Sequence, residues 1–98
     1  MGKIISSRAN GDDKVLLEIE VDYIESLNLK GHINNVHVFS EDAAQIRTNM
    51  SQRGTNEATK YFLIPRVLRN NIDFDSFAKC QRIDMLEKSI FVFIVDLK

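Results

Sequence analysis

The spacing of apolar and polar residues predicts a chain built mainly from β-strands. Between residues 15 and 21 every second position is apolar, which is the period of a strand with one apolar face. The turn residues at 10–13 precede this segment, and residues 3–8 can form another strand before the turn. The first 21 residues are therefore predicted to form a β-hairpin.

A short helix is predicted to follow over residues 22–30. Asp22 with Glu25 three residues later fits a capping box. In this motif the side chain of the first residue accepts from the backbone N–H of the second, and the side chain of the second reaches back to the backbone N–H of the first. Gly31 stands where the end of a helix favours a residue with positive φ. Residues 36–38 are then predicted to form a strand.

The middle of the chain contains one ambiguous segment and one clear strand. Apolar and polar positions alternate over residues 44–52, which favours a strand, although two neighbouring alanines at its start would permit a helix. Residues 59–64 are rich in strand-forming types, and Pro65 ends that strand because it has no N–H for the ladder. One or two helical turns are expected over residues 66–71.

The last third of the chain predicts another hairpin. Residues 78–85 and 89–97 are strand-like segments on either side of the polar turn at 86–88. Residues 91–95 are continuously apolar, so this strand is expected to be buried on both faces or to lie at an interface.

These elements suggest an internal repeat within one domain covering residues 1–98. The predicted order of hairpin, short helix and hairpin occurs twice, over residues 1–43 and 44–98. Apolar positions correspond between the two copies, for example Leu17 with Phe62. One such unit is too small to hold a core, whereas two units can share one.

Two short motifs resemble the AbrB/MazE/SpoVT swapped-hairpin family. Residues 64–69 (Ile-Pro-Arg-Val-Leu-Arg) are similar to its strand-to-helix signature, and residues 25–31 (Glu-Ser-Leu-Asn-Leu-Lys-Gly) are similar to its helix end. The first half lacks the proline, since Glu20 stands there, and the second half lacks the compact helix end. The resemblance implies a mainly β fold with short helices (α+β). It further implies a small β-barrel of two hairpin-helix-hairpin units, an AbrB-like pseudo-dimer, present as a monomer or as a homodimer.

Charge is distributed unevenly along the chain. Residues 1–43 hold eight acidic and four basic side chains, whereas residues 44–71 hold five basic side chains and Glu57 alone. The middle segment is therefore where an anionic partner would be attracted. By position, the family resemblance implies that nucleic acid is contacted by the basic residues of the first hairpin in each unit and of the strand-to-helix junction: Arg47, Arg53, Lys60, Arg66, Arg69, Arg8 and Lys14.

The function expected from these features is that of a DNA-binding regulator or nucleoid-associated protein whose partner is duplex DNA. A β-ribbon can enter the major groove, where arginine contacts phosphates or guanine edges. The acidic first half predicts a lopsided footprint and modest affinity. The main alternative is a protein-interaction module, antitoxin-like or adaptor, that uses residues 90–95. RNA binding through Tyr61 or Phe62 is a further alternative.

Other classes of protein find little support in the sequence. We identify no catalytic constellation, metal site or cofactor motif, so we do not expect an enzyme. Cys80 is the only cysteine, which excludes an internal disulfide and a cysteine-based zinc site. No segment resembles a signal peptide or a membrane span, and we therefore expect a cytoplasmic protein.

Overall fold

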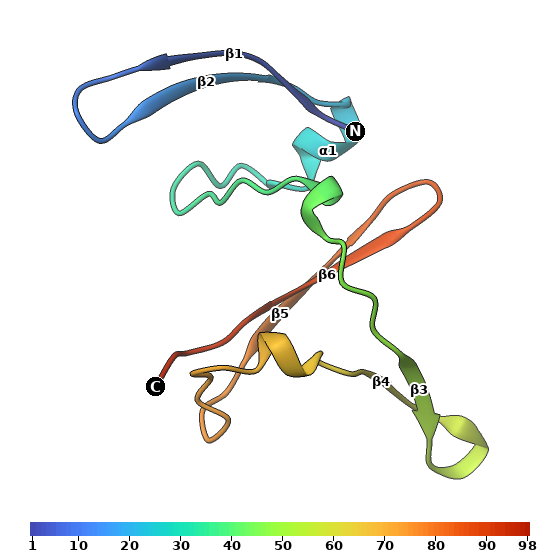
Figure 1. The fold of residues 1–98 in the computed structure, drawn as a ribbon. Coiled ribbons are helices and arrows are strands. Elements are labelled where there is room, and N and C mark those ends of the chain that lie inside the picture. Colours follow the sequence, from blue (N-terminus) through green and yellow to red (C-terminus); the bar gives the residue numbers. More distant parts are fainter. The chain divides into compact units, whose positions relative to one another are not determined.

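The structure, a computed structural model, describes all 98 residues and consists mainly of antiparallel β-hairpins (Figure 1). The chain divides into two compact units, which we call unit 1 (Met1–Val38) and unit 2 (Phe39–Lys98). Each hairpin is a separate two-stranded sheet. The helical elements are short: one helix of five residues and three turns of 3-10 helix. No helix in the structure has the length and apolar character needed to cross a membrane.

Unit 1 contains one hairpin and the helix. Strand β1 (Lys3–Ala9) pairs antiparallel with β2 (Val15–Glu20), as the alternating pattern predicted. The ladder shifts register between Ile4 and Ser6, which marks a bulge. Gly11 has a φ of 83° in the connecting turn, a conformation that glycine adopts without steric cost.

Helix α1 (Tyr23–Leu27) confirms the predicted helix but is shorter than residues 22–30. The predicted capping box is wrong, because the side chain of Asp22 makes no capping hydrogen bond. The amino group of Met1 donates instead to the carboxylates of Asp22 and Glu25, at 2.7 Å to Glu25. Both hydrogen bonds raise the pKa of the Met1 amino group, and the bond to Asp22 has the larger effect.

The strand predicted over residues 36–38 is also wrong, since this segment has no regular structure. A strand is stable only when a neighbouring strand pairs with its backbone groups, and no ladder reaches these residues. Asn35, directly before them, has a φ of 56°, which interrupts extended backbone.

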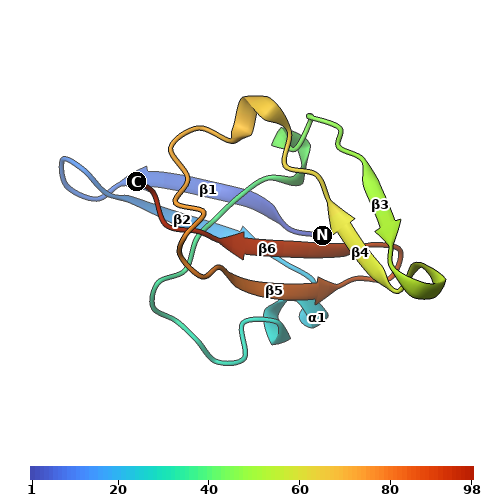
Figure 2. The same cartoon turned by 90° about the horizontal axis from the view of Figure 1, so that it is seen from below.

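Unit 2 contains two hairpins, and the segment 63–78 that connects them includes one 3-10 turn. Its strands and turns are η1 (Glu41–Ala43), β3 (Met50–Arg53), η2 (Thr55–Glu57), β4 (Thr59–Phe62), η3 (Arg66–Leu68), β5 (Lys79–Asp84) and β6 (Ser89–Ile94). Strands β3 and β4 pair antiparallel, as do β5 and β6, and Figure 2 shows the long antiparallel arrows of β5 and β6. The predicted hairpin at the end of the chain is therefore confirmed, with strands shorter than expected.

The ambiguous segment 44–52 becomes a strand only from Met50 onward. Before that point two hydrogen bonds still tie it to Leu63, the residue after β4. The Leu63 N–H donates to the Asn49 carbonyl at 3.1 Å, and the Thr48 hydroxyl donates to the Leu63 carbonyl. Of the helical turns expected over residues 66–71, only the 3-10 turn η3 forms.

The predicted barrel of two hairpin-helix-hairpin units is wrong. A closed barrel requires every edge strand to pair with a neighbour, whereas these six strands form three separate two-stranded ladders. Unit 1 has one hairpin rather than two, so the order of elements is not repeated. Whether the two halves share an ancestral repeat stays a prediction.

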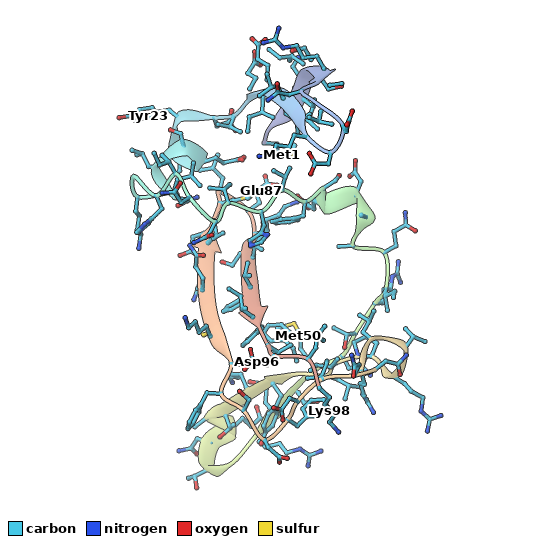
Figure 3. All side chains as sticks on the ribbon, turned by 90° about the vertical axis from the view of Figure 1, so that its left-hand side faces the viewer. Met1, Tyr23, Met50, Glu87, Asp96 and Lys98 are labelled. Atoms are coloured by element: carbon cyan, nitrogen blue, oxygen red, sulfur yellow. The ribbon has the colours of Figure 1, made fainter.

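Neither unit encloses a core. No side chain is buried, and the side chains of each unit stand out from the ribbons (Figure 3). The expectation that the apolar strand 91–95 is buried on both faces is therefore wrong: Phe91 is 43% exposed and Phe93 is 56% exposed. With two strands a sheet has two free edges and two open faces, and a single ladder cannot cover the apolar residues that its own alternation aligns.

Candidate nucleic-acid interface

The basic residues predicted to contact nucleic acid are all exposed, and most belong to unit 2. Arg53 ends β3 and Lys60 lies in β4, so the hairpin β3–β4 carries two of them. Arg66 opens η3 and Arg69 follows it directly, whereas Arg47 lies in the irregular segment before β3.

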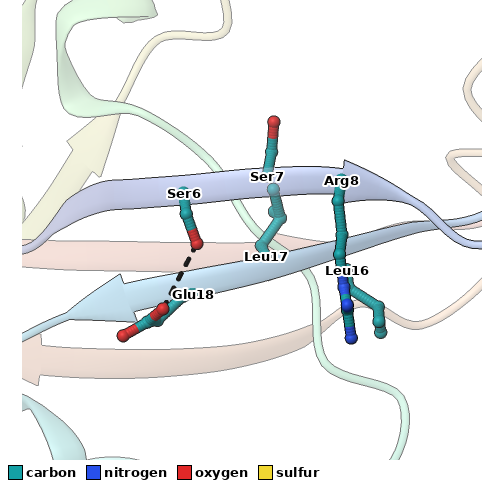
Figure 4. Close-up of a pocket in the computed structure, with 6 residues that line it drawn as sticks. All are labelled: Ser6, Ser7, Arg8, Leu16, Leu17 and Glu18. Atoms are coloured by element: carbon teal, nitrogen blue, oxygen red, sulfur yellow. Dashed lines mark hydrogen bonds between the residues drawn. The ribbon is translucent and has the colours of Figure 1, made fainter.

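Arg8 and Lys14 belong to unit 1. Arg8 lies in β1 directly opposite Leu16 of β2, and the two side chains extend to the same side of the ladder (Figure 4). Two pairs further along, the Ser6 hydroxyl donates to Glu18 at 3.2 Å. Lys14 lies in the turn, where its carbonyl accepts from the N–H of Asn10 at 2.8 Å. This hairpin carries a shallow hollow, which is lined by Ser6, Ser7, Arg8, Leu16, Leu17 and Glu18.

The register of β3–β4 fixes which side chains share a face. Gln52 is opposite Lys60, and Arg53 is opposite Thr59. Because side chains alternate along a strand, Lys60 and Arg53 point to opposite faces of the hairpin. The two cations of this hairpin therefore do not share one face. The sequence missed this because the register depends on the length of the loop between the strands.

The basic residues of segment 44–71 are free of acidic partners within unit 2. Salt bridges in this unit join Arg82 to Asp84 at 2.6 Å and Lys88 to Glu41 at 2.6 Å, and both lie outside that segment. The ammonium of Lys60 donates to neutral oxygens only, the side-chain amide of Gln52 and the backbone carbonyl of Glu57. These two hydrogen bonds hold the Lys60 ammonium in place, and its positive charge remains available to an anionic partner.

Arg69 is positioned by a backbone contact. Its Nε donates to the carbonyl of Ile64 at 2.6 Å, which ties the side chain to the backbone just after β4. This bond uses one of the five guanidinium N–H groups and leaves the terminal NH₂ groups without an acidic partner. Arg69 can therefore hold the turn at Pro65 and still offer its terminal NH₂ groups to an anion.

A hollow of about 540 Å³ lies beside β4, and its lining combines cationic with aromatic side chains. Arg53, Arg69, Tyr61 and Phe74 all border it. The sequence did not single out Phe74, although an aromatic residue between two aspartates in a loop was a usable signal. No group of three or more His, Cys, Asp or Glu side chains is placed to hold a metal ion.

The acid–base groups with altered pKa values lie outside this hollow. Hydrogen bonds from Ser89, at 2.5 Å, and from Arg82 lower the pKa of Asp84. The hydrogen bond to Glu41 raises the pKa of Lys88. Both groups belong to surface contacts that connect strand ends and loops.

Comparison with known proteins yields no relative. No family model matches the chain, and neither a curated protein nor a solved structure is significantly similar to it.

Proposed function

We propose that this protein is a cytoplasmic DNA-binding regulator or nucleoid-associated protein that contacts duplex DNA through the hairpin β3–β4. The observation that carries the proposal is the set of cations in segment 44–71, which have no acidic partner within unit 2, whereas Arg82 and Lys88 are paired. Unpaired cations on an exposed element attract phosphates without first having to break a protein ion pair.

The opposite orientation of Arg53 and Lys60 suits a ribbon inserted into a groove. The major groove is wide enough for a two-stranded ribbon and is bordered by a phosphate backbone on each side. A hairpin lying edge-on in the groove would direct Arg53 toward one backbone and Lys60 toward the other.

The test is the salt dependence of duplex binding. We expect the affinity of the intact protein to fall steeply between about 50 and 200 mM salt, and Arg53→Ala to reduce the slope of log affinity against log salt by about 0.9, the value for one lost phosphate contact. The matched control is Lys79→Ala, which removes the same charge from β5. Absent or salt-insensitive binding, or an equal effect of the control, would overturn the proposal.

A protein-interaction module is the second candidate, and strand β6 favours it. Strand β6 pairs only with β5, so its other edge is free, and Phe93 and Ile94 are more than half exposed. A free apolar edge strand can accept a strand from a partner protein. Under this alternative, Phe93→Ser abolishes partner binding while Arg53→Ala leaves it unchanged, which is the reverse of the result expected for DNA.

A further inference from the structure

We propose that the hollow beside β4 binds one unpaired nucleobase together with its phosphate, so that the protein also recognises single-stranded nucleic acid. This inference rests on the proposed nucleic-acid function and specifies the form of nucleic acid that this site takes. Its experiment below separates failure of the inference from failure of that function.

The ring available for stacking is that of Tyr61. The register places Tyr61 opposite Ser51, on the same face of the hairpin as Arg53. Its neighbour Phe62 points to the other face, where its ring lies 5.4 Å from that of Phe91. Phe62 also borders the hollow, but its ring is occupied by the contact with Phe91. The ring of Tyr61 has no aromatic partner in the chain, and Tyr61 is 44% exposed.

The cations at the hollow suit a phosphate. Arg53 and Arg69 both border it, from β3 and from the residue after η3 respectively. The bond from Nε of Arg69 to the Ile64 carbonyl restrains the side chain and leaves its terminal donors for an oxyanion. Arginine presents its donors in a planar fork that matches phosphate oxygens, and here no acid within unit 2 competes.

The aromatic and cationic groups together specify the ligand. Phe74 supplies another aromatic side chain at the border of the hollow and is 63% exposed. Rings beside two arginines complement a ligand that has a flat apolar face and an adjacent negative charge, which describes a nucleotide. In a continuous duplex each base face is covered by its neighbours, so only an unpaired base can lie against Tyr61.

The experiment compares single-stranded and duplex binding by the full chain. The probes are a labelled thymidine oligonucleotide of about 15 nucleotides and a labelled duplex of similar length. We expect Tyr61→Leu to weaken single-strand binding about tenfold, the effect of losing one stacked base, while duplex affinity changes less than twofold. The matched control is Phe77→Leu, which removes a ring that is 99% exposed in the same unit and should change neither affinity.

A second measurement does not depend on the folding of a Tyr61 variant. The chain has no tryptophan and two tyrosines, so in Tyr23→Phe the only tyrosine emission comes from Tyr61. We expect the oligonucleotide to quench this emission by direct stacking.

Three results would overturn the inference. If single strands leave the Tyr61 emission unchanged, or if Tyr61→Leu weakens duplex and single-strand binding equally, the stacking role is wrong. If duplex binds with the expected salt dependence while single strands do not bind, the inference fails and the proposed function stands. If neither probe binds, the proposed function itself fails.

Discussion

The contact between Phe62 and Phe91 gives a direct test of how unit 2 holds together. Phe62 belongs to β4 and Phe91 to β6, so this pair connects the two hairpins of the unit. The ring centroids lie 5.4 Å apart with a tilt of 44°, within the range of favourable aromatic pairs. The guanidinium of Arg82 lies 5.5 Å from the centroid of the Phe91 ring and adds a cation–π contact.

The exposed fractions set the expected size of the effect. Phe62 is 45% exposed and Phe91 is 43% exposed, so each residue has a little over half of its surface removed from water. Full burial of a phenylalanine contributes about 1.5–3 kcal/mol, and each truncation to alanine should therefore cost about 1 kcal/mol. Pairing of the rings should add a coupling free energy of about 0.5 kcal/mol, the lower end for aromatic pairs because both rings are half exposed.

The assay is a double-mutant cycle in urea denaturation. Free energies of unfolding are measured for the wild type, Phe62→Ala, Phe91→Ala and the double variant, and the coupling is the departure from additivity. Phe91→Ala should cost more than Phe62→Ala, because it also removes the contact with Arg82. Phe77→Ala is the control, since Phe77 is 99% exposed and its loss should change stability by less than about 0.5 kcal/mol. Strictly additive effects, or losses no larger than that of the control, would refute the contact between the hairpins.

Three further predictions concern single positions. Hydrogen bonds from Ser89 and Arg82 lower the pKa of Asp84, so the contribution of the Asp84 carboxylate to stability is present above its ordinary pKa and is lost as the pH falls through the pKa of the folded protein. Ser89→Ala should raise the pKa of Asp84 in an NMR titration, and an unchanged pKa would count against the contact. Gly54→Ala should destabilise the β3–β4 hairpin by about 1–3 kcal/mol, because φ is 89° there and a Cβ would lie 3.3 Å from the Thr59 hydroxyl; urea denaturation measures this cost, and unchanged stability would refute the assigned backbone. Cys80 is exposed, so a thiol reagent should label it in the native protein as fast as in urea, and strong protection would show that this face of β5 is covered.

The sequence predicted hairpins well where one short turn joins two alternating segments. The strands β1 and β2 follow from the alternation between residues 15 and 21 and from the turn before it. The strands β5 and β6 follow in the same way from segments on either side of residues 86–88. In both cases the pairing is local, and the turn brings together the two segments that the pattern marks.

The sequence failed where the outcome depends on contacts between elements. Alternation shows that a strand has an apolar face but does not show which other strand will cover it. The pattern therefore could not show that the hairpins remain three separate ladders and do not close into a barrel. The faces of Arg53 and Lys60 were missed for a related reason. A change of one residue in the loop between β3 and β4 would reverse which side chains share a face, and the register follows from backbone geometry that includes positive φ values at Gly54 and Asn56.

The open construction of unit 2 connects its stability to its proposed function. A two-stranded hairpin by itself is marginally stable in water, and β3–β4 has no third strand to support it. The contact of Phe62 with Phe91 is therefore expected to raise the fraction of molecules in which the hairpin, and with it the hollow, is formed. Apparent affinity for a ligand scales with that fraction, so Phe91→Ala should weaken nucleic-acid binding even though Phe91 does not line the hollow. The same relation makes bound nucleic acid stabilise the hairpin, since a ligand that binds only the ordered form shifts the equilibrium toward it.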